Sequence, residues 1–358
     1  MSKVATVGVI ANPASSRDVR RIVARGPATT ANDKINMLVR LMEGLGGAGV
    51  NTVISMSDAG GIAAGLAGLS TRKSASNWPV LHFVDQEITH TPTDTVTAVE
   101  HMAERGVDAI VVLGGDGTNR LLIGKSGDIP VASISSGTNN AFPSRHEPTV
   151  VGLAVGFLAT GRVDRQRCSY RAKTLQVSDG STSTKALVDM AILDGDRIAT
   201  GAIWDVTSLR EVFLCFAEPH AIGLSSLGGR LRPVCRRDPH GLRITVDERS
   251  NHRVLAPIAP GLVRDIGVAH VDVMSAGNAV EVDVSSGVIA LDGERAHRFP
   301  ERRSVTVSLD LDGPIVLDVQ RAMQLAAEGQ QVEEHNARPH TTDPSQTHPT
   351  NHEGESND

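Results

Sequence analysis

A buried strand that runs directly into a glycine-rich turn constrains this chain most. Residues 108–113 read Asp-Ala-Ile-Val-Val-Leu, and Gly114-Gly115-Asp116-Gly117-Thr118 follows at once. A short apolar run bounded by turn residues is typical of a strand inside a sheet. Two adjacent glycines let the backbone turn tightly and approach a ligand closely, because no Cβ stands in the way. The segment predicts an α/β sheet with a ligand-binding loop at the carboxyl end of one strand.

The rest of the first half alternates between strand and helix patterns. Residues 35–45 carry apolar side chains at helical spacing and end at Gly46. Thr91 and Pro92 are typical of an N-cap and a first helical position. Alternating strands and helices predict a parallel sheet covered by helices. The other strand-like runs are residues 4–11, 51–57, 80–85 and 129–134.

The pattern changes after about Arg162 to short runs rich in Val, Ile and Thr, separated by Gly, Asp and Asn. Such runs predict a mostly antiparallel β structure. We expect hairpin turns at Gly277-Asn278 and Asp312-Gly313, and one helix near residues 207–217. The predicted strands are residues 187–193, 242–246, 280–284, 288–291, 305–309 and 315–319.

The last segment has a different composition from the rest of the chain. Residues 329–358 contain almost no apolar side chains, so burial cannot offset the entropy of ordering them. Their four histidines are irregularly spaced, which favours a solvated tail over a metal site. We therefore expect an α/β domain with a parallel sheet at residues 1–161, a mostly antiparallel β domain at 162–328 and a disordered tail at 329–358.

Composition excludes several classes of protein. The net charge of −6 leaves no basic footprint for nucleic acid or an anionic membrane surface. No run approaches the roughly 18 to 20 apolar residues of a membrane span, and the first apolar run reads as a strand rather than a signal peptide. The three cysteines show no CxxC spacing, which is typical of a reducing cytoplasm and argues against a zinc site. We expect a cytoplasmic protein with no nucleic-acid or membrane partner.

The Gly114–Thr118 turn suits phosphate binding. Its N–H groups, with those that open the next helix, can surround phosphate oxygens. Asp116 would then point into the site, where it could hold Mg²⁺, orient an acceptor hydroxyl or take its proton. The alternative is an ordinary strand-to-helix turn with an aspartate that caps the helix.

Two further loops follow strands of the same predicted sheet. Asn12 and Ser15 follow the first strand, and both side chains could donate to a phosphate. The alternative there is an Asx turn or a helix cap. A polar loop, Ser136-Gly137-Thr138-Asn139-Asn140, follows the strand at residues 129–134 and could form a second wall of a nucleotide site. Because the carboxyl ends of parallel strands meet at one edge, the three loops support one another.

A family resemblance rests on these three loops. Gly-Gly-Asp-Gly-Thr, the Asn-Pro-Ala-Ser of residues 12–15 and the Ser-Gly-Thr-Asn-Asn-Ala-Phe of residues 136–142 resemble the superfamily of NAD kinases, diacylglycerol kinases and sphingosine kinases. Within it, residues 10–21 most resemble the NAD-kinase-like proteins of acetoin-catabolism gene clusters. The resemblance covers residues 4 to 325. It implies an NAD kinase-like fold, with the active site in the cleft between an α/β domain and a β domain.

The resemblance also implies roles for particular residues. Gly114, Gly115, Gly117 and Thr118 match the loop that binds ATP phosphates, and Gly137 to Asn140 match a second loop of the lipid kinases. Asp292-Gly293-Glu294 matches an Asp-Gly-Glu motif whose glutamate activates the acceptor, although Asp292-Gly293 alone reads as a hairpin turn. The implied catalytic residues are Asp116 and Glu294, and the implied Mg²⁺ ligands are Asp116 and Asp292.

These roles predict an ATP- and Mg²⁺-dependent kinase that transfers a γ-phosphoryl group to a hydroxyl. The expected acceptor is NAD, which would give NADP, or a small metabolite of acetoin-type catabolism, and we expect a homo-oligomer. One alternative is a diacylglycerol-type lipid kinase. Another is a non-catalytic nucleotide-binding regulator, because residues 223–229 lack the tyrosine of the Gly-Ser-Thr-Ala-Tyr segment of NAD kinases. Lys34 and Arg120 could bind phosphates or could be solvated surface charges.

Overall fold

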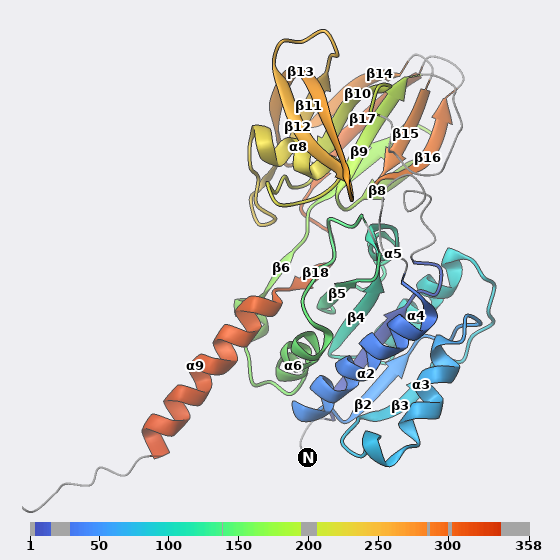
Figure 1. Ribbon diagram of the computed structural model, residues 1–358, viewed down its shortest axis with the longest axis vertical. Coiled ribbons are helices and arrows are strands. Elements are labelled where there is room, and N and C mark those ends of the chain that lie inside the picture. The colour runs from blue at the N-terminus through green and yellow to red at the C-terminus, as the bar shows by residue number, and fades with distance from the viewer. Residues whose placement is uncertain are drawn as a thin grey trace, which may run out of the picture.

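The computed structural model describes residues 4–15, 29–137, 139–194, 206–284, 287–299 and 303–337. They form two bodies along the long axis of the molecule (Figure 1). Helices and a mainly parallel sheet form the first body, and antiparallel sheets form the second. This arrangement confirms the predicted fold class. None of the helices in these ranges is long and apolar enough to span a membrane.

The first body is built on a seven-stranded sheet of order β3-β2-β1-β4-β5-β18-β6. The strands from β3 to β18 are parallel, as the alternating pattern predicts, and β6 is antiparallel to β18. All six residues of β4 are buried, because helices cover both faces. The strands are β1 (Thr6–Ala11), β2 (Thr52–Ser55), β3 (Val80–Phe83), β4 (Ala109–Gly114), β5 (Val131–Ser135), β6 (Ser169–Arg171) and β18 (Ile315–Leu317).

Separate apolar clusters line the two faces of this sheet. Side chains from α2, α3, α6 and α9 pack on one face, and α4 packs on the other. Thr91 caps α4 and Pro92 is its first residue, as predicted. The helices are α2 (Ala31–Gly47), α3 (Ile62–Ser70), η1 (Lys73–Ala75), α4 (Pro92–Glu104), α5 (Asp116–Arg120), α6 (Pro148–Ala159), α7 (Arg165–Cys168) and α9 (Val319–Ala337).

The second body contains a seven-stranded sheet of order β12-β13-β11-β10-β9-β15-β16 and a four-stranded sheet of order β14-β17-β7-β8. All their pairings are antiparallel, and buried side chains of both sheets share one core. Its elements are β7 (Thr174–Ser178), β8 (Ser183–Ala186), β9 (Asp189–Asp194), β10 (Leu209–Leu214), α8 (Leu224–Leu231), β11 (His240–Val246), β12 (Arg253–Ala259), β13 (Leu262–Ser275), β14 (Ala279–Val284), β15 (Gly287–Leu291), β16 (Glu294–Phe299) and β17 (Arg303–Asp310).

The helix predicted near residues 207–217 is wrong. That segment is strand β10, which lies between β9 and β11, and the helix of this region is α8. Val212, Phe213 and Leu214 are all buried in the sheet. A short, continuous apolar run shows neither the two-residue repeat of a strand nor the 3.6-residue repeat of a helix. The sequence therefore does not distinguish strand from helix there.

Two predicted hairpins are also wrong. Gly277 adopts a left-handed φ of 80°, but its turn joins β13 to β14, which belong to different sheets. The turn at Gly313 joins β17 to β18, which lies in the sheet of the first body. Both turns therefore carry the chain between layers, and nothing in the local sequence distinguishes such a turn from a hairpin.

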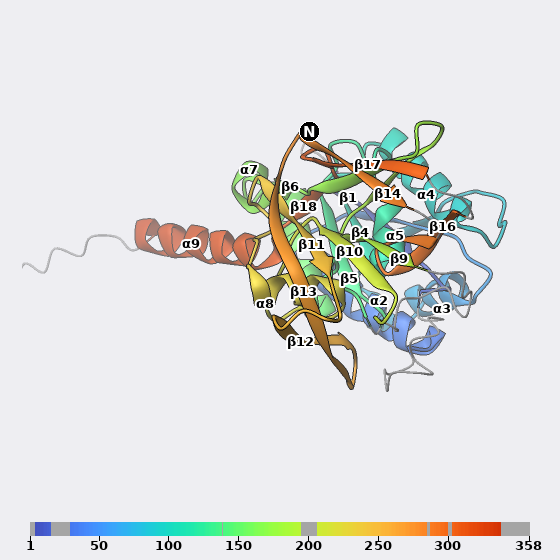
Figure 2. The same cartoon turned by 90° about the horizontal axis from the view of Figure 1, so that it is seen from above.

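The chain returns to the first body near its end. After β18, helix α9 packs on α6 through Val319, Ala322 and Leu325 and then projects away from the body (Figures 1 and 2). The helix continues to Ala337 and passes Gly329, where the sequence predicts a disordered tail to begin. Residues 329–337 are therefore helical, and residues 338–358 lie outside the described ranges.

Candidate active site

Three strand ends bring the predicted loops together at one edge of the first sheet. β4 lies between β1 and β5, so the loop after β4 is flanked by the other two. The N–H of Asn12 donates to the carbonyl of Leu113 at 3.3 Å, and the N–H of Ser136 donates to the carbonyl of Gly114 at 3.2 Å. The predicted convergence of the three loops is therefore present.

Side chains also link the loops. Asn12 Nδ2 donates to Thr118 Oγ1 at 3.0 Å, and the hydroxyls of Ser15 and Ser136 are 2.8 Å apart. These amide and hydroxyl groups are the donors that the sequence analysis assigns to phosphate. Thr138, a member of the same predicted set, lies outside the described residues.

Asn140 occupies the space beside two of the predicted phosphate-loop glycines. A Cβ on Gly115 would lie 2.8 Å from Asn140 Oδ1, and a Cβ on Gly137 would lie 2.8 Å from Asn140 Nδ2. Asn140 Nδ2 also donates to Ser135 Oγ at 3.0 Å. A side chain at either position would have to displace the Asn140 amide, so glycine leaves Asn140 in place and keeps the backbone open to a ligand.

Asp116 is buried and joins two loops. Its carboxylate accepts hydrogen bonds from the N–H of Ala141, at 3.0 Å to Oδ2, and from the N–H of Phe142, at 2.9 Å to Oδ1. Gly115, rather than Asp116, is the N-cap of α5, and it makes no side-chain cap bond. The predicted alternative of a helix-capping aspartate is therefore wrong, since Asp116 holds the loop that follows β5.

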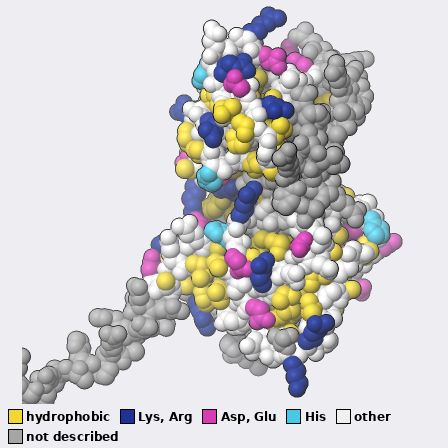
Figure 3. Space-filling view, viewed as in Figure 1, with side chains coloured by type: hydrophobic (Ala, Val, Ile, Leu, Met, Phe, Trp, Pro, Cys, Tyr) yellow, Lys and Arg dark blue, Asp and Glu magenta, His cyan; other side chains and the backbone are white. Residues whose placement is uncertain are grey.

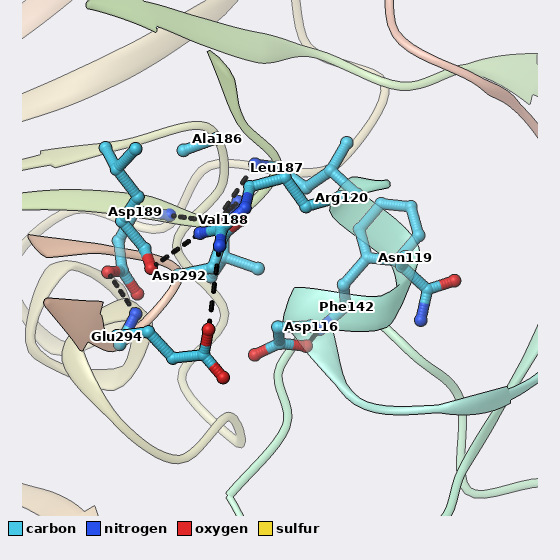
Figure 4. Close-up of polar contacts among 12 residues, drawn as sticks. Asp116, Asn119, Arg120, Phe142, Ala186, Leu187, Val188, Asp189, Asp292 and Glu294 are labelled. Carbon is cyan, nitrogen blue, oxygen red and sulfur yellow. Dashed lines mark hydrogen bonds and ion pairs between the residues drawn. The ribbon is translucent and has the colours of Figure 1, made fainter. Parts of the chain in front are cut away.

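Glu294 of the second body lies against the Gly114–Thr118 loop of the first. A Cβ on Gly117 would lie 3.1 Å from both carboxylate oxygens of Glu294. Arg120 lies beside it, with Nη2 3.5 Å from Glu294 Oε2 and Nη1 donating to the carbonyl of Leu291 at 2.9 Å (Figure 4). The two motifs that the resemblance assigns to the active site therefore meet, and Arg120 connects them.

Asp292 occupies a hairpin turn and points into the second body. Its φ of 51° and the φ of 74° at Gly293 give the left-handed turn between β15 and β16, so the predicted hairpin is present. Asp292 Oδ1 accepts hydrogen bonds from the N–H groups of Leu187 and Val188 at 2.9 and 2.8 Å. Burial raises the pKa of Asp292 to about 8, although the nearby Arg120 guanidinium acts in the opposite direction.

A small cavity of about 20 Å³ lies between the bodies, with Asp116, Asn139, Asp189 and Asp292 in its wall. That volume is enough for one water molecule or ion. Within the described part of the chain, Asn139 Oδ1 and Asp292 Oδ2 are buried and accept no hydrogen bond. Asp292 Oδ2 is 3.6 Å from Arg120 Nη1, an ion pair without a hydrogen bond. Buried oxygens without a hydrogen bond are costly, and oxygen is the donor that Mg²⁺ prefers.

The donor set therefore fits a cation that is only partly held by protein. The described residues contain no group of three or more carboxylate, imidazole or thiolate side chains arranged to hold a metal. Mg²⁺ commonly uses one or two carboxylates and completes its shell with water and phosphate. Asp189 is a member of this wall that the sequence analysis missed. A carboxylate inside the apolar run at residues 187–193 was the available signal.

A larger cavity of about 790 Å³ adjoins the small one, and the two share Ala141 and Ile222. Its walls combine rings, such as Phe142 and Tyr170, with charged groups, such as Arg236. On the face shown in Figure 3, several Lys, Arg and His side chains lie near the waist between the two bodies. A cavity of this size and mixed lining is typical of a small-molecule site.

Lys34 supports a loop of the protein, a role that differs from the two predicted for it, phosphate binding and a solvated surface charge. It is only 1% exposed, and its Nζ donates to the carbonyls of Asn12, Pro13 and Ser15 at 2.8, 3.1 and 3.2 Å. It is therefore not a solvated surface charge, and three protein oxygens take its donors. Lys34, which lies on α2, therefore fixes the shape of the loop after β1.

The fold and the converging loops define a protein of the NAD kinase-like class. A model of the ATP-NAD kinase N-terminal domain matches residues 7–163, and a model of the acetoin catabolism protein X C-terminal domain matches residues 173–312. Acetoin catabolism protein X of Cupriavidus necator is 39% identical over 329 residues, which cover 89% of this chain and 92% of that protein. The chain belongs to the acetoin catabolism protein X family.

A solved structure shows the same fold at low identity, and a second gives a weaker superposition. Yeast NADH kinase complexed with NADH superimposes with a TM-score of 0.52 and 14% identity, over 95% of this chain and 90% of that one. A putative diacylglycerol kinase from Bacillus anthracis gives a TM-score of 0.45 and 12% identity, over 87% of this chain and 97% of that one. The first of these likenesses supports a common fold.

Proposed function

We propose that this chain is an ATP- and Mg²⁺-dependent phosphotransferase of the NAD kinase type. The acceptor is a hydroxyl of NAD or of a small metabolite linked to acetoin catabolism. One observation carries the proposal: the Glu294 carboxylate lies 3.1 Å from where a Cβ of Gly117 would be. A phosphate loop from one body and an acceptor-side carboxylate from the other therefore face the same space.

The first body supplies the nucleotide side of the site. Asn12, Ser15, Ser136 and the Gly114–Thr118 loop present amide, hydroxyl and backbone donors along one sheet edge. Such donors bind phosphate oxygens without chemistry of their own, so they position the γ-phosphoryl group. When bound, Mg²⁺ would neutralise charge on the phosphates, and Asp116 and Asp292 are the carboxylates that would hold it.

The second body supplies the acceptor side. The acceptor lies in the large cavity with its hydroxyl towards the small one, whose wall includes Gly293, the residue before Glu294. Glu294 takes the hydroxyl proton as the oxygen bonds to the γ-phosphorus. The bond from that phosphorus to the bridging oxygen breaks, and ADP leaves. Gly223 and Leu224, which open the nearest counterpart of the dinucleotide-reading segment of NAD kinases, line the small cavity. That placement supports a dinucleotide acceptor.

A parallel assay tests the proposal. The purified protein would be incubated with ATP and Mg²⁺, together with NAD, acetoin or diacylglycerol in separate reactions. ADP would be measured beside the mass of the phosphorylated product. We expect equal amounts of ADP and product with NAD or acetoin, and neither without an acceptor. Product with diacylglycerol alone would instead favour the lipid kinase.

A second candidate is a nucleotide-binding regulator without phosphoryl transfer. We call the Gly114–Thr118 loop with the loops after β1 and β5 the phosphate cradle. The observation that favours this candidate is that protein groups already fill part of the cradle. Both oxygens of Asp116 accept backbone N–H groups, and Asn140 fills the space beside Gly115. This candidate predicts ATP binding without turnover for every acceptor in the assay.

We also propose a cytoplasmic location, which the three cysteines support because none forms a disulfide. Assembly as a homo-oligomer stays a prediction.

A further inference from the structure

Arg236 of the second body holds the loop that follows β5 in the first body. Its Nη1 donates to the carbonyl of Phe142 at 2.8 Å, and its Nη2 donates to the carbonyl of Ala141 at 2.6 Å. No sequence motif points to this residue. It lies in the wall of the large cavity.

One peptide unit connects Arg236 to Asp116. The carbonyl of Ala141 and the N–H of Phe142 belong to the same planar peptide bond, in which they point in opposite directions. The oxygen accepts from Arg236, and the nitrogen donates to Asp116 Oδ1 at 2.9 Å. Rotation of this unit would break both hydrogen bonds, so the guanidinium and the carboxylate are held at two ends of one rigid group.

Arg236 is itself fixed by the second body. Glu218 accepts from its Nε at 2.9 Å and from its Nη2 at 3.1 Å, and the guanidinium lies over the Phe216 ring at 4.3 Å. Paired Arg–carboxylate bonds of this kind set orientation as well as distance. The guanidinium is therefore a rigid support, and the loop must follow the position of the second body.

We propose that Arg236 is a positioning residue that sets the orientation of the Asp116 carboxylate through the Ala141–Phe142 peptide unit. Its effect on rate rests on the proposed function, whereas its effect on the loop does not. Misplacement of a reacting group by about 1 Å can reduce a rate about 100-fold. The phosphate-side groups of Asn12 and Ser15 make no hydrogen bond to Arg236, whereas Ser136–Asn140 precede the carbonyls that it holds. Loss of Arg236 should therefore change kcat more than it changes KM for ATP.

The test compares Arg236→Gln and Arg236→Lys with Arg243→Gln as a matched control. Arg243 also lies in the second body, pairs with a glutamate (Glu211, 2.9 Å) and lies over a ring (Phe213, 5.7 Å). It makes no contact with the loop after β5 among the hydrogen bonds of the described residues. Amide hydrogen exchange at Ala141 and Phe142 is the first readout, and kcat and KM for ATP are the second.

We expect Arg236→Gln to speed exchange at both amides about tenfold or more, since they lose their fixed partner geometry. It should lower kcat about 100-fold and raise KM for ATP by a much smaller factor. Arg236→Lys keeps the positive charge but lacks the planar guanidinium. Its amide exchange rates and kcat should lie between those of the parent and Arg236→Gln. It also keeps the comparison usable if the glutamine variant does not fold.

Unchanged exchange at Ala141 and Phe142 in both Arg236 variants would overturn the proposal. An equal increase in Arg243→Gln would also overturn it, because the effect would then be a general loosening. Absence of turnover in the parent protein would refute the proposed function instead, and the exchange comparison would still decide the role of Arg236.

Discussion

Arg120 and Glu294 form an ion pair across the two bodies, with Nη2 3.5 Å from Oε2 (Figure 4). Arg120 is the last residue of α5, two residues after Thr118 of the glycine-rich loop, and Glu294 opens β16 after the hairpin turn. Arg236 makes the opposite crossing, from the second body to the loop after β5. Each body thus holds the other through an arginine, and the candidate active site lies between Arg120 and Arg236.

The Glu294→Gln substitution tests the acceptor side of the site. The change keeps the size of the side chain and removes the group that takes the hydroxyl proton, so turnover should fall about 100-fold or more. ATP affinity should be nearly unchanged, because the cradle belongs to the first body. Steady-state kinetics and calorimetric titration measure the two effects. Glu281→Gln on β14 is the control, and a folded Glu294→Gln protein at the parent rate would remove Glu294 from the mechanism.

Asp116→Asn tests the carboxylate beside the phosphate loop. We expect a folded protein that loses about 100-fold or more in turnover, the usual scale for a positioned acid–base or metal group. The amide can still accept one of the two hydrogen bonds from Ala141 and Phe142, so the loop should stay in place. Circular dichroism checks the fold, and near-parental turnover would contradict the assignment.

Asp292 should make stability depend on pH. Its pKa rises from 3.8 to about 8 in the folded protein, which therefore keeps a proton that the unfolded chain releases. The free energy of unfolding should then fall as pH rises from about 4 to about 8. Asparagine carries no such proton and tolerates the left-handed φ. Thermal melts in a chelator at about pH 5 and about pH 8 should show a smaller drop in Tm for Asp292→Asn than for the parent. Equal drops would contradict the buried, protonated carboxyl.

Lys34→Met tests the support beneath the loop after β1. The substitution removes the Lys34 donor from the carbonyls of Asn12, Pro13 and Ser15, and that of Asn12 keeps the Ser15 hydroxyl as a donor at 2.9 Å. Each carbonyl left unsatisfied costs about 1–3 kcal/mol. We expect a loss of about 2 kcal/mol or more in the free energy of unfolding, measured by urea denaturation. Lys125→Met removes an exposed pair with Glu100 and should cost less than about 1 kcal/mol. Equal losses would show that Lys34 has no special role.

Local patterns in the sequence predict the parts of the site that depend on local backbone. The glycines of residues 114–117 have close neighbours where a Cβ would stand, and the Asp292-Gly293 turn has a left-handed backbone, so their residue types reveal them. Asp189, Lys34 and Arg236 act through partners far along the chain, and their residue types alone match ordinary surface charges. The same limit explains β18, whose place in the first sheet depends on a return of the chain that no local pattern encodes.

Titration of ATP with Mg²⁺ into the parent and Gly115→Val proteins tests the central assignment, the phosphate cradle, most directly. A Cβ at Gly115 would lie 2.8 Å from Asn140 Oδ1, so valine must displace the Asn140 side chain and fill space beside the loop proposed to bind phosphate. Gly68→Val is the control, because no atom lies within 4 Å of the Cβ that would be added there. We predict ATP binding by the parent and the control, and a loss of about 100-fold or more in affinity for Gly115→Val, as expected when a backbone cradle is closed. Equal affinities in all three proteins would show that the Gly114–Thr118 loop does not bind the nucleotide.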